Sequence, residues 1–257
     1  MTYTQAIMRQ VGDNFAQGIT TVNLDADLNW PNYELAVRQH QAYADLLLAL
    51  GLEVKMLDRL SDYPDAHFVE DAAIVTPEIG VITRPGAEAR LGEEQHMIHV
   101  LTEYRTLASI EAPGTLDGGD ILLFDKTCFI GLSERTNEEG ATQLSQILTP
   151  YGYRCTTIPV GAGLHLKSSI NYIGHGSLLV TEDFSNLSIL ADFKKIVVDK
   201  DEEYAANTLW VNDHLITPKG FPKTKAKLET TSLKVIELDV SEMQKMDGGL
   251  TCLSLRF

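Results

Sequence analysis

The chain ends in Asp247-Gly248-Gly249-Leu250-Thr251-Cys252-Leu253-Ser254-Leu255-Arg256-Phe257, where a cysteine begins the alternating apolar pattern of a short strand. The two glycines before Cys252 permit positive φ angles and a close approach of the backbone to another group, which suits a residue at the mouth of a pocket. A buried thiol in a core strand is the simpler interpretation, because free cysteine is among the most buried residue types. A catalytic role for Cys252 therefore requires partners elsewhere in the chain.

At the other end of the chain, residues 5–11 are predicted to form a strand that could complete one structural unit with the terminal strand. Between the two ends, segments with strand, helix and hairpin patterns recur about every 45 residues. This recurrence favours a repeat architecture closed into a ring. An open α/β sheet remains the alternative, because the amino-acid letters themselves do not repeat at that period.

The pattern also predicts individual elements. A helix is expected over 32–50, with Asn32 as its cap and a glycine after its end. Thr136 and Glu139 form a capping box for a helix that ends near residue 148. A further helix is expected over 186–193, and a strand over 68–75.

The 257 residues carry a net charge of −15, which argues against nucleic acid and anionic membranes as partners and favours cationic ligands. The start of the chain lacks the pattern of a signal peptide, and the longest purely apolar run, Leu46–Leu50, is too short to span a bilayer. The three cysteines show no metal-ligand spacing, so a reduced, cytoplasmic setting is expected. No linker divides residues 1–257, which predicts a single domain.

Several charged residues interrupt apolar segments. Glu70 and Asp71 are adjacent within the apolar run 68–75, so one of them should face inward, and burying an unpaired charge is costly. Asp65 lies just before this run. Asp117 and Asp120 enclose a glycine pair that leads into another apolar strand, and a turn or cap role for Asp120 is as reasonable as a functional one.

His165 lies between two leucines after a glycine-rich loop, where a core histidine and a functional one are equally plausible. Arg90 and Arg135 follow strand ends, where guanidinium groups are suited to bind carboxylates. One cysteine, one histidine and a surplus of carboxylates together indicate covalent catalysis by a thiolate on a cationic substrate such as a guanidinium.

Six segments, in this order along the chain, resemble the dimethylarginine dimethylaminohydrolase family. The resemblance extends from about residue 5 to the end of the chain, and the segments are Phe68-Val69-Glu70-Asp71, Ile82-Thr83-Arg84-Pro85-Gly86-Ala87, Thr115-Leu116-Asp117-Gly118-Gly119-Asp120, Gly131-Leu132-Ser133-Glu134-Arg135-Thr136-Asn137, Leu164-His165-Leu166-Lys167 and Asp247-Gly248-Gly249-Leu250-Thr251-Cys252. The resemblance implies the pentein fold, a five-bladed pseudo-symmetric α/β propeller with its active site in a central channel. It thereby favours the ring over the open sheet.

The resemblance also implies hydrolysis of Nω-methylated arginines to citrulline and an alkylamine through a covalent cysteine thiouronium, without a cofactor or a metal. It makes Cys252 the nucleophile, His165 the general acid and base, and Asp117 the carboxylate that orients the histidine. Some relatives carry glutamate at the position of Asp117, which is the shorter of the two acids.

Substrate binding is implied for three groups of residues. These are Asp65, Glu70 and Asp71 for the guanidinium, Arg90 and Arg135 for the α-carboxylate, and the carbonyls of Ile19 and Met246 for the α-amino group, with residues 17–20 as a lid. The expected partner is a small molecule, with neither nucleic acid nor membrane, and a homodimer is conceivable. Two alternatives remain: an arginine deiminase, although deiminases are usually much longer, and a pentein that only binds a partner.

Overall fold

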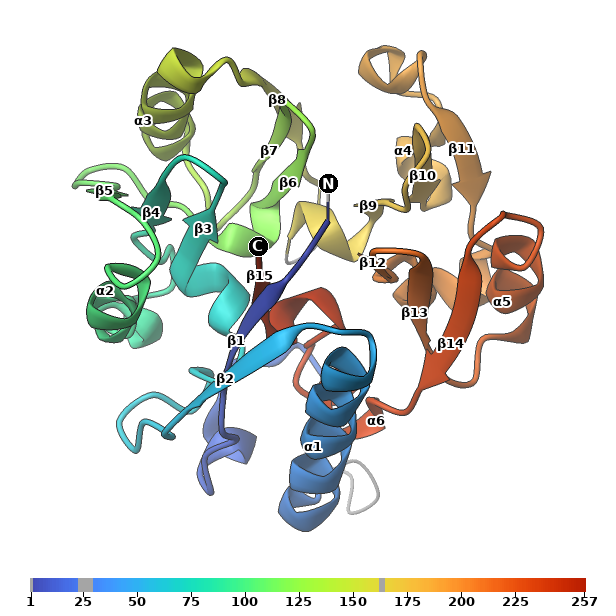
Figure 1. Ribbon diagram of the computed structural model, residues 1–257, viewed down its shortest axis with the longest axis horizontal. Helices are drawn as coiled ribbons and strands as arrows, with labels where there is room; N and C mark the ends of the chain where they lie inside the picture. The colour runs from blue at the N-terminus through green and yellow to red at the C-terminus, as the bar shows by residue number, and fades with distance from the viewer. Residues whose placement is uncertain (1, 23–29, 162–164) are drawn as a thin grey trace.

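The structure is a computed structural model, and it describes residues 2–22, 30–161 and 165–257. Five three-stranded sheets surround a common centre, with both chain ends close to it (Figure 1). In the order of their hydrogen-bonded strands, the sheets are β15 (Leu255–Arg256), β1 (Gln5–Arg9) and β2 (Glu53–Leu57); β3 (Ala73–Val75), β4 (Gly80–Ile82) and β5 (Leu107–Ser109); β6 (Ile121–Phe124), β7 (Thr127–Leu132) and β8 (Arg154–Pro159); β9 (Ile170–Tyr172), β10 (Ser177–Val180) and β11 (Lys194–Val197); and β12 (Leu209–Val211), β13 (His214–Pro218) and β14 (Lys234–Leu238).

Helices connect the strands within and between these sheets. They are α1 (Tyr33–Ala49), α2 (Gln95–Leu101), α3 (Glu138–Leu148), α4 (Glu182–Ser185), α5 (Pro222–Leu228) and α6 (Ser241–Gln244). In each sheet the first two strands pair antiparallel, and the third pairs parallel with the middle one after a helical connection.

The two ends of the chain share one sheet. Ile7 in β1 pairs antiparallel with Leu255 in β15, and β1 pairs parallel with β2 after α1. This pairing closes the five sheets into a ring, which confirms the pentein propeller predicted from the resemblance. Each hairpin forms a sheet with the strand that follows it in the chain. The predicted strand–helix–strand–hairpin unit joined each hairpin to the strand before it, so the predicted units were offset from the observed sheets.

The prediction of the first long helix is confirmed, because Asn32 Oδ1 accepts a hydrogen bond from Leu35 N at 2.9 Å at the start of α1. The cap of α3 was wrong by one residue: Asn137 Oδ1, rather than Thr136, accepts the bond from Gly140 N at 2.8 Å. The helix predicted over 186–193 is also wrong, since α4 ends before this segment and the segment itself forms only a 3-10 turn, η7 (Ser188–Leu190). Elements of three or four residues are too short for a helical period to identify.

The core beside the terminal segment is built by α1 and β1. Tyr43 and Leu47 of α1 are buried with Met8 of β1, and fully burying side chains of this size contributes roughly 1.5–3 kcal/mol each. The Tyr43 hydroxyl also lies 2.7 Å from Ser254 Oγ, two residues after Cys252. This packing fixes the terminal segment against the body of the protein.

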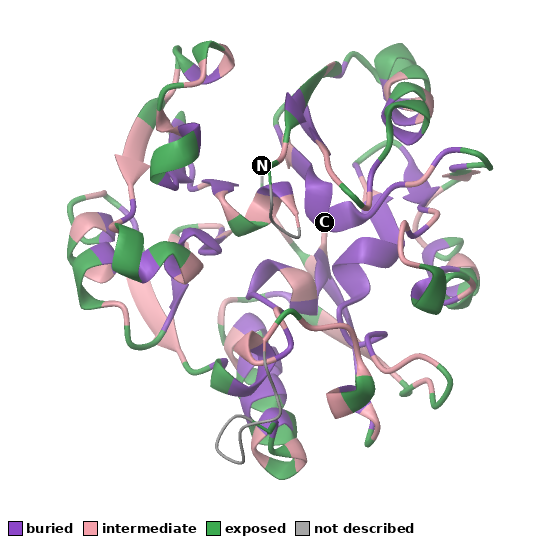
Figure 2. Ribbon diagram, turned by 180° about the vertical axis from the view of Figure 1, so that it is seen from behind, coloured by how far each residue is buried: buried purple, intermediate pink, exposed green. Residues whose placement is uncertain are grey.

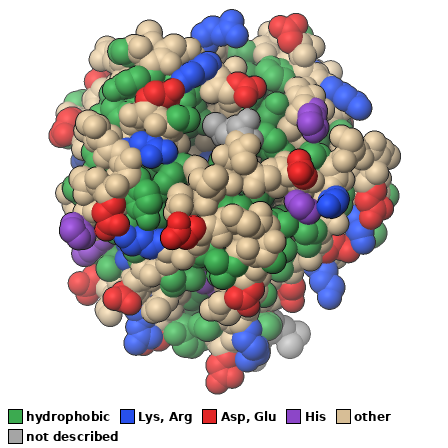
Figure 3. All heavy atoms as spheres, viewed as in Figure 1, with side chains coloured by type: hydrophobic (Ala, Val, Ile, Leu, Met, Phe, Trp, Pro, Cys, Tyr) green, Lys and Arg blue, Asp and Glu red, His purple; other side chains and the backbone are tan. Residues whose placement is uncertain are grey.

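Burial is concentrated on the elements that surround the centre, and the outer faces of the helices are exposed (Figure 2). On the face shown in Figure 3, lysine and arginine side chains are scattered among aspartate and glutamate. Within the ranges that the structure describes, no helix combines the length and apolarity needed to cross a membrane.

Candidate active site

In every sheet, the edge strand nearest the centre of the ring is preceded by a short 3-10 turn (Figure 1). These turns are η2 (Val69–Ala72) before β3, η4 (Gly118–Asp120) before β6, η6 (Leu166–Ser168) before β9, η8 (Lys200–Ala206) before β12 and η9 (Thr251–Leu253) before β15. The turns η2 and η9 contact each other, and η4 contacts both η2 and η6. The repeated fold therefore brings residues far apart in the sequence to one place.

Where the turns meet there is a small cavity. The predicted site residues that line it are Ile19, Asp65, Asp71, Arg90, Arg135, His165, Met246 and Cys252. Asp117 lies behind His165, completely buried. Glu70 lines an adjoining cavity together with His165 and Cys252. The structure thus brings all ten predicted residues together.

Asp117 holds the imidazole of His165. His165 Nε2 lies 3.0 Å from Asp117 Oδ2 and 3.8 Å from Asp71 Oδ1, and Asp117 Oδ1 accepts a hydrogen bond from Gly86 N. Burial disfavours the protonated ring, but Asp71 and the hydrogen bond to Asp117 outweigh it and raise the pKa of His165 to about 9. The free protein therefore carries an imidazolium at neutral pH.

Cys252 lies on η9 rather than at the start of the terminal strand, and Gly249 N donates to its Sγ at 3.4 Å. Burial, followed by the charges of Glu70 and Asp71, raises the pKa of Cys252 to about 12. Without a ligand the sulfur is consequently a neutral thiol.

Of the two uses predicted for the glycines before Cys252, the structure confirms the close approach of the backbone to another group and not the positive φ. The positive φ, 57°, falls on Asp247. A Cβ at Gly248 would lie 2.2 Å from the Phe68 ring, and one at Gly249 would lie 2.4 Å from the Asn207 amide. Space, rather than a positive φ, requires glycine at both positions.

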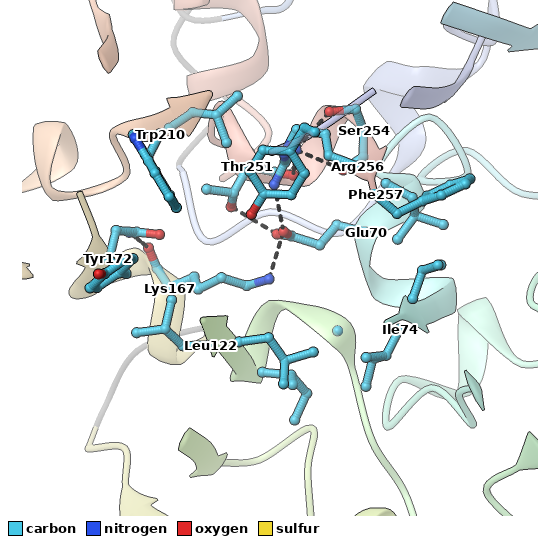
Figure 4. Close-up of a pocket in the computed structure, with 18 of the residues that line it drawn as sticks. Glu70, Ile74, Leu122, Lys167, Tyr172, Trp210, Thr251, Ser254, Arg256 and Phe257 are labelled. Carbon is cyan, nitrogen blue, oxygen red and sulfur yellow. Dashed lines mark hydrogen bonds and ion pairs between the residues drawn. The ribbon is translucent and has the colours of Figure 1, made fainter. Parts of the chain in front are cut away.

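Glu70 and Asp71 were expected in a strand, but they lie on η2 and both are buried. A strand would have buried one and exposed the other, whereas the tight turn directs both inward. Glu70 Oε1 accepts a bond from Lys167 Nζ at 2.6 Å, and Arg256 Nη2 lies 3.7 Å away (Figure 4). Glu70 and Lys167 also line a third cavity, whose walls include Trp210, so they lie between that cavity and the site.

Asp71 and Arg90 form a buried ion pair in the wall of the site. Arg90 Nη1 donates to Asp71 Oδ2 at 2.6 Å, while its Nε donates to Glu93 at 3.0 Å and its Nη2 to the Phe68 carbonyl at 3.1 Å. Burial would raise the pKa of Asp71, but His165 and Arg90 outweigh it and lower the pKa to about 2. Asp71 is therefore an anion beside the cysteine. Arg135 lies nearby, with Nη1 3.9 Å from Asp117 Oδ2.

The predicted lid is attached to the site by hydrogen bonds. Ile19 N donates to both carboxylate oxygens of Asp65, at 3.2 and 3.1 Å. Thr20 Oγ1 donates to the carbonyl of Lys245 at 3.0 Å, and Thr21 Oγ1 donates to Asp247 Oδ1 at 3.1 Å. These contacts hold residues 17–21 against the segment that leads to Cys252. The glycine-rich loop before His165 includes residues 162–164, which lie outside the described residues.

The sequence did not predict that two residues, Asp120 and Asn207, position the segments of His165 and Cys252. Asp120 Oδ1 accepts from Leu166 N at 2.9 Å and so fixes the residue after His165. Asn207, directly after η8, accepts from Thr251 N at 3.0 Å and donates to the carbonyl of Lys167 at 3.0 Å. For Asp120, the glycine pair before it was a sequence signal that could have indicated this role. Asn207 has none, since only the ring closure brings it between the histidine and cysteine segments.

The site is rich in ligand atoms for cations. Asp71, Asp117 and His165 present atoms within 4.8 Å of one another, a spacing that a divalent cation could use. The carboxylates Asp65 and Asp71 beside a thiol equally suit an organic cation, because a guanidinium donates several hydrogen bonds in one plane.

Known proteins resemble this chain along its whole length. The family model described as N,N dimethylarginine dimethylhydrolase, eukaryotic, matches residues 13–216. The N(G),N(G)-dimethylarginine dimethylaminohydrolase of Pseudomonas aeruginosa is 37% identical, covering 99% of this chain and 100% of its own length. The enzyme of that name from Streptomyces coelicolor is 32% identical, covering 100% and 98%.

Solved structures give the same result. A cysteine-to-serine mutant of the Pseudomonas aeruginosa protein, complexed with citrulline, superposes with a TM-score of 0.96 at 36% identity and covers 100% of both chains. The N-terminal domain of ArgZ, a cyanobacterial arginine dihydrolase, has a TM-score of 0.87 at 22% identity, covers 98% and 97%, and shares the fold.

Proposed function

The chain belongs to the dimethylarginine dimethylaminohydrolase family, and from this premise we propose that it converts Nω-methylated arginines to citrulline and an alkylamine. It is a hydrolase that acts on the C–N bond of a guanidino group. The observation that carries the proposal is the meeting of a thiol, an imidazolium and buried carboxylates at one cavity.

Asp65 and Asp71, with Glu70 behind them, bind the substrate guanidinium in this proposal. The anionic state of Asp71 supports its role, because a buried carboxylate gains most from a cationic partner. Arg90 and Arg135 bind the α-carboxylate. Arg90 Nη1 donates one of its two N–H groups to Asp71, and the second N–H can donate to a ligand. The carbonyls of Ile19 and Met246 accept the α-amino group, and both residues line the cavity.

Substrate binding activates Cys252. The charges of Glu70 and Asp71 contribute to the raised pKa of the thiol, and a bound guanidinium compensates them. An opposite charge within a few Å lowers a pKa by about 1–3 units, so the thiolate fraction rises when the substrate arrives. The thiol proton leaves to solvent at this stage.

The thiolate then attacks the guanidinium carbon, and a tetrahedral adduct forms. His165, already an imidazolium and oriented by Asp117, donates its proton to the departing alkylamine as the C–N bond breaks. Water attacks the resulting S-alkylthiouronium with neutral His165 as base, the C–S bond breaks, and citrulline and the thiolate are released. Two solved structures support this scheme: the Pseudomonas aeruginosa mutant contains citrulline, and a histidine-to-glycine variant of a dimethylarginine dimethylaminohydrolase is an adduct with S-methyl-L-thiocitrulline.

The proposal assigns no cofactor to the reaction, and it keeps the expectation of a cytoplasmic enzyme with a small-molecule substrate and a possible homodimer.

A product assay tests the function. The protein is incubated separately with arginine, monomethylarginine and both dimethylarginines, and citrulline and the released amine are quantified in each reaction. Equal amounts of citrulline and methylated amine are expected, with Cys252→Ser as the blank. Release of ammonia from arginine alone would instead identify a deiminase, and the absence of citrulline from all four would refute hydrolysis.

A further inference from the structure

Two cysteines that the proposed mechanism does not use lie opposite each other in the third sheet. Cys128 in β7 and Cys155 in β8 are direct partners in the parallel register, and both are free thiols. Neighbouring strands lie about 4.8 Å apart, within the range of about 4.4–6.8 Å that separates the Cα atoms of bonded cysteines.

The two side chains also face the same way. Both pack against the apolar cluster beneath α3, which includes Leu144 and Leu148. Residues in register on parallel strands point to the same face of a sheet, so the two sulfurs are already directed toward a common volume. A disulfide between Cys128 and Cys155 therefore needs no change of strand register.

The two thiols differ in accessibility and acidity. Cys155 lies on β8, an edge strand, and is partly exposed, with both sequence neighbours exposed. Cys128 is fully buried. A hydrogen bond from Cys128 lowers the pKa of Cys155 to about 7, whereas the pKa of Cys252 is raised to about 12. At neutral pH the thiolate is therefore found on Cys155, and thiolates are the form that peroxides oxidise.

We propose that Cys128 and Cys155 form a redox-sensitive dithiol that hydroperoxides oxidise to a disulfide before they oxidise Cys252. The Cys155 thiolate attacks one peroxide oxygen, the O–O bond breaks, and a sulfenic acid and, after protonation, water are formed. The sulfur of Cys128 then attacks the sulfur of Cys155 and loses its proton, and the sulfenic oxygen leaves as a second water. The two thiols lose two electrons and hydrogen peroxide gains them.

The dithiol is separate from the catalytic residues. Cys128 and Cys155 each occupy the second position of their strand. The segments with Arg135 and His165 follow the opposite ends of these strands. Oxidation of the pair should therefore leave citrulline formation within about twofold of the reduced enzyme, because the cross-link forms at the ends of β7 and β8 opposite to the site segments and shares no partner with them.

Peptide mapping after limited oxidation provides the test. The protein receives one molar equivalent of hydrogen peroxide, free thiols are blocked with iodoacetamide after unfolding in urea, and trypsin cleavage separates the three cysteines into the peptides 127–135, 155–167 and 246–256. A disulfide-linked pair of the first two peptides is expected, with the third fully alkylated and the link lost after dithiothreitol. Oxidation of the third peptide first, or the absence of the linked pair, would overturn the proposal.

Variants make the order of events measurable. Cys128→Ser should retain a sulfenic acid on residue 155 that dimedone traps, while Cys155→Ser should leave Cys128 unmodified. Trapping on Cys128 in the second variant would contradict the assigned order. Cys252→Ser should form the disulfide normally, so the result does not depend on the proposed catalytic function. Circular dichroism before oxidation verifies that each variant is folded.

Discussion

Thr251 Oγ1 donates a 2.7 Å hydrogen bond to Glu70 Oε2, which joins the residue before the proposed nucleophile to a carboxylate 181 positions earlier. The same carboxylate accepts from Lys167 at 2.6 Å, two residues after His165. Glu70 thus links the turns that carry the cysteine and the histidine. Their relative position depends on a buried charged contact between three sheets, and breaking such a contact leaves an uncompensated charge.

The first prediction concerns the nucleophile. Cys252→Ser should keep the fold and lose several orders of magnitude in kcat, because a serine hydroxyl is not ionised by the substrate cation as a thiol is. Citrulline formation and a thermal melt measure the two effects, with Cys128→Ser as the matched control of unchanged activity. Substantial turnover by Cys252→Ser would remove the cysteine from the mechanism, as would inactivation by alkylation at Cys128 or Cys155 alone.

The second prediction separates binding from proton transfer. His165→Ala should lower kcat by at least about 10²–10⁴-fold, since both amine departure and water attack need a proton carrier. Substrate affinity should change far less. Asp117→Asn should act in the same direction but more weakly, because it alters the orientation and charge of the imidazole rather than removing it. If His165→Ala turns over normally, or fails only through weakened binding, His165 is a core histidine.

A third prediction addresses Asn207, which joins the segments of Thr251 and Lys167. Asn207→Ala leaves the Thr251 N–H without its acceptor and should cost about 1–3 kcal/mol of the free energy of unfolding. It should also lower kcat more than it raises KM, because Cys252 loses its support. Asn186→Ala, at an exposed position, is the control. A loss of stability with unchanged kcat would restrict Asn207 to a structural role.

Two buried histidines predict acid sensitivity. Burial lowers the pKa of His40 to about 4 and, together with the charges of His40 and Arg90, that of His67 to about 3, and within the described structure neither Nε2 has a hydrogen-bond partner. Both stay neutral in the folded protein, whereas the unfolded chain protonates them near pH 6.5. The stabilising contribution of the two neutral histidines to the free energy of unfolding is therefore complete above that pH. It is lost as the pH falls toward 4 for His40 and toward 3 for His67.

Each histidine contributes a slope of up to about 1.4 kcal/mol per pH unit to the free energy of unfolding. Urea denaturation between pH 7 and 4 measures that slope. His40→Gln should reduce it, and His99→Gln, at an exposed position, should not. An unchanged slope in His40→Gln would show that this histidine does not titrate on unfolding.

The fifth prediction concerns metal ions. Zn²⁺ should inhibit by displacing the protons of Cys252 and His165, because thiolate and imidazole are ligands it prefers, and Asp71 and Asp117 offer oxygen atoms beside them. Chelation with EDTA should leave citrulline formation unchanged. A loss of activity on chelation that added zinc restores would require a metal in the reaction and would replace the mechanism proposed above.

The sequence by itself determined the features that depend on neighbouring residues. Asn32 marks the start of α1 because a cap needs only a side-chain oxygen three residues before an amide. The motifs around Asp117, His165 and Cys252 identified the family and supplied the residues that we propose for the reaction. The alternation of apolar residues predicted the strands but not their grouping, since register is set by contacts between segments.

Only the tertiary structure decided what each buried polar group contacts. Glu70 and Asp71 are adjacent in the sequence, yet Glu70 bonds Lys167 and Asp71 bonds Arg90, because the 3-10 turn η2 directs their side chains to different neighbours. Asn207 has no sequence signal, and it acquires its position between the histidine and cysteine segments when β1 pairs with β15 and the ring closes. Such contacts depend on distances between remote segments, and these distances exist only in the folded chain.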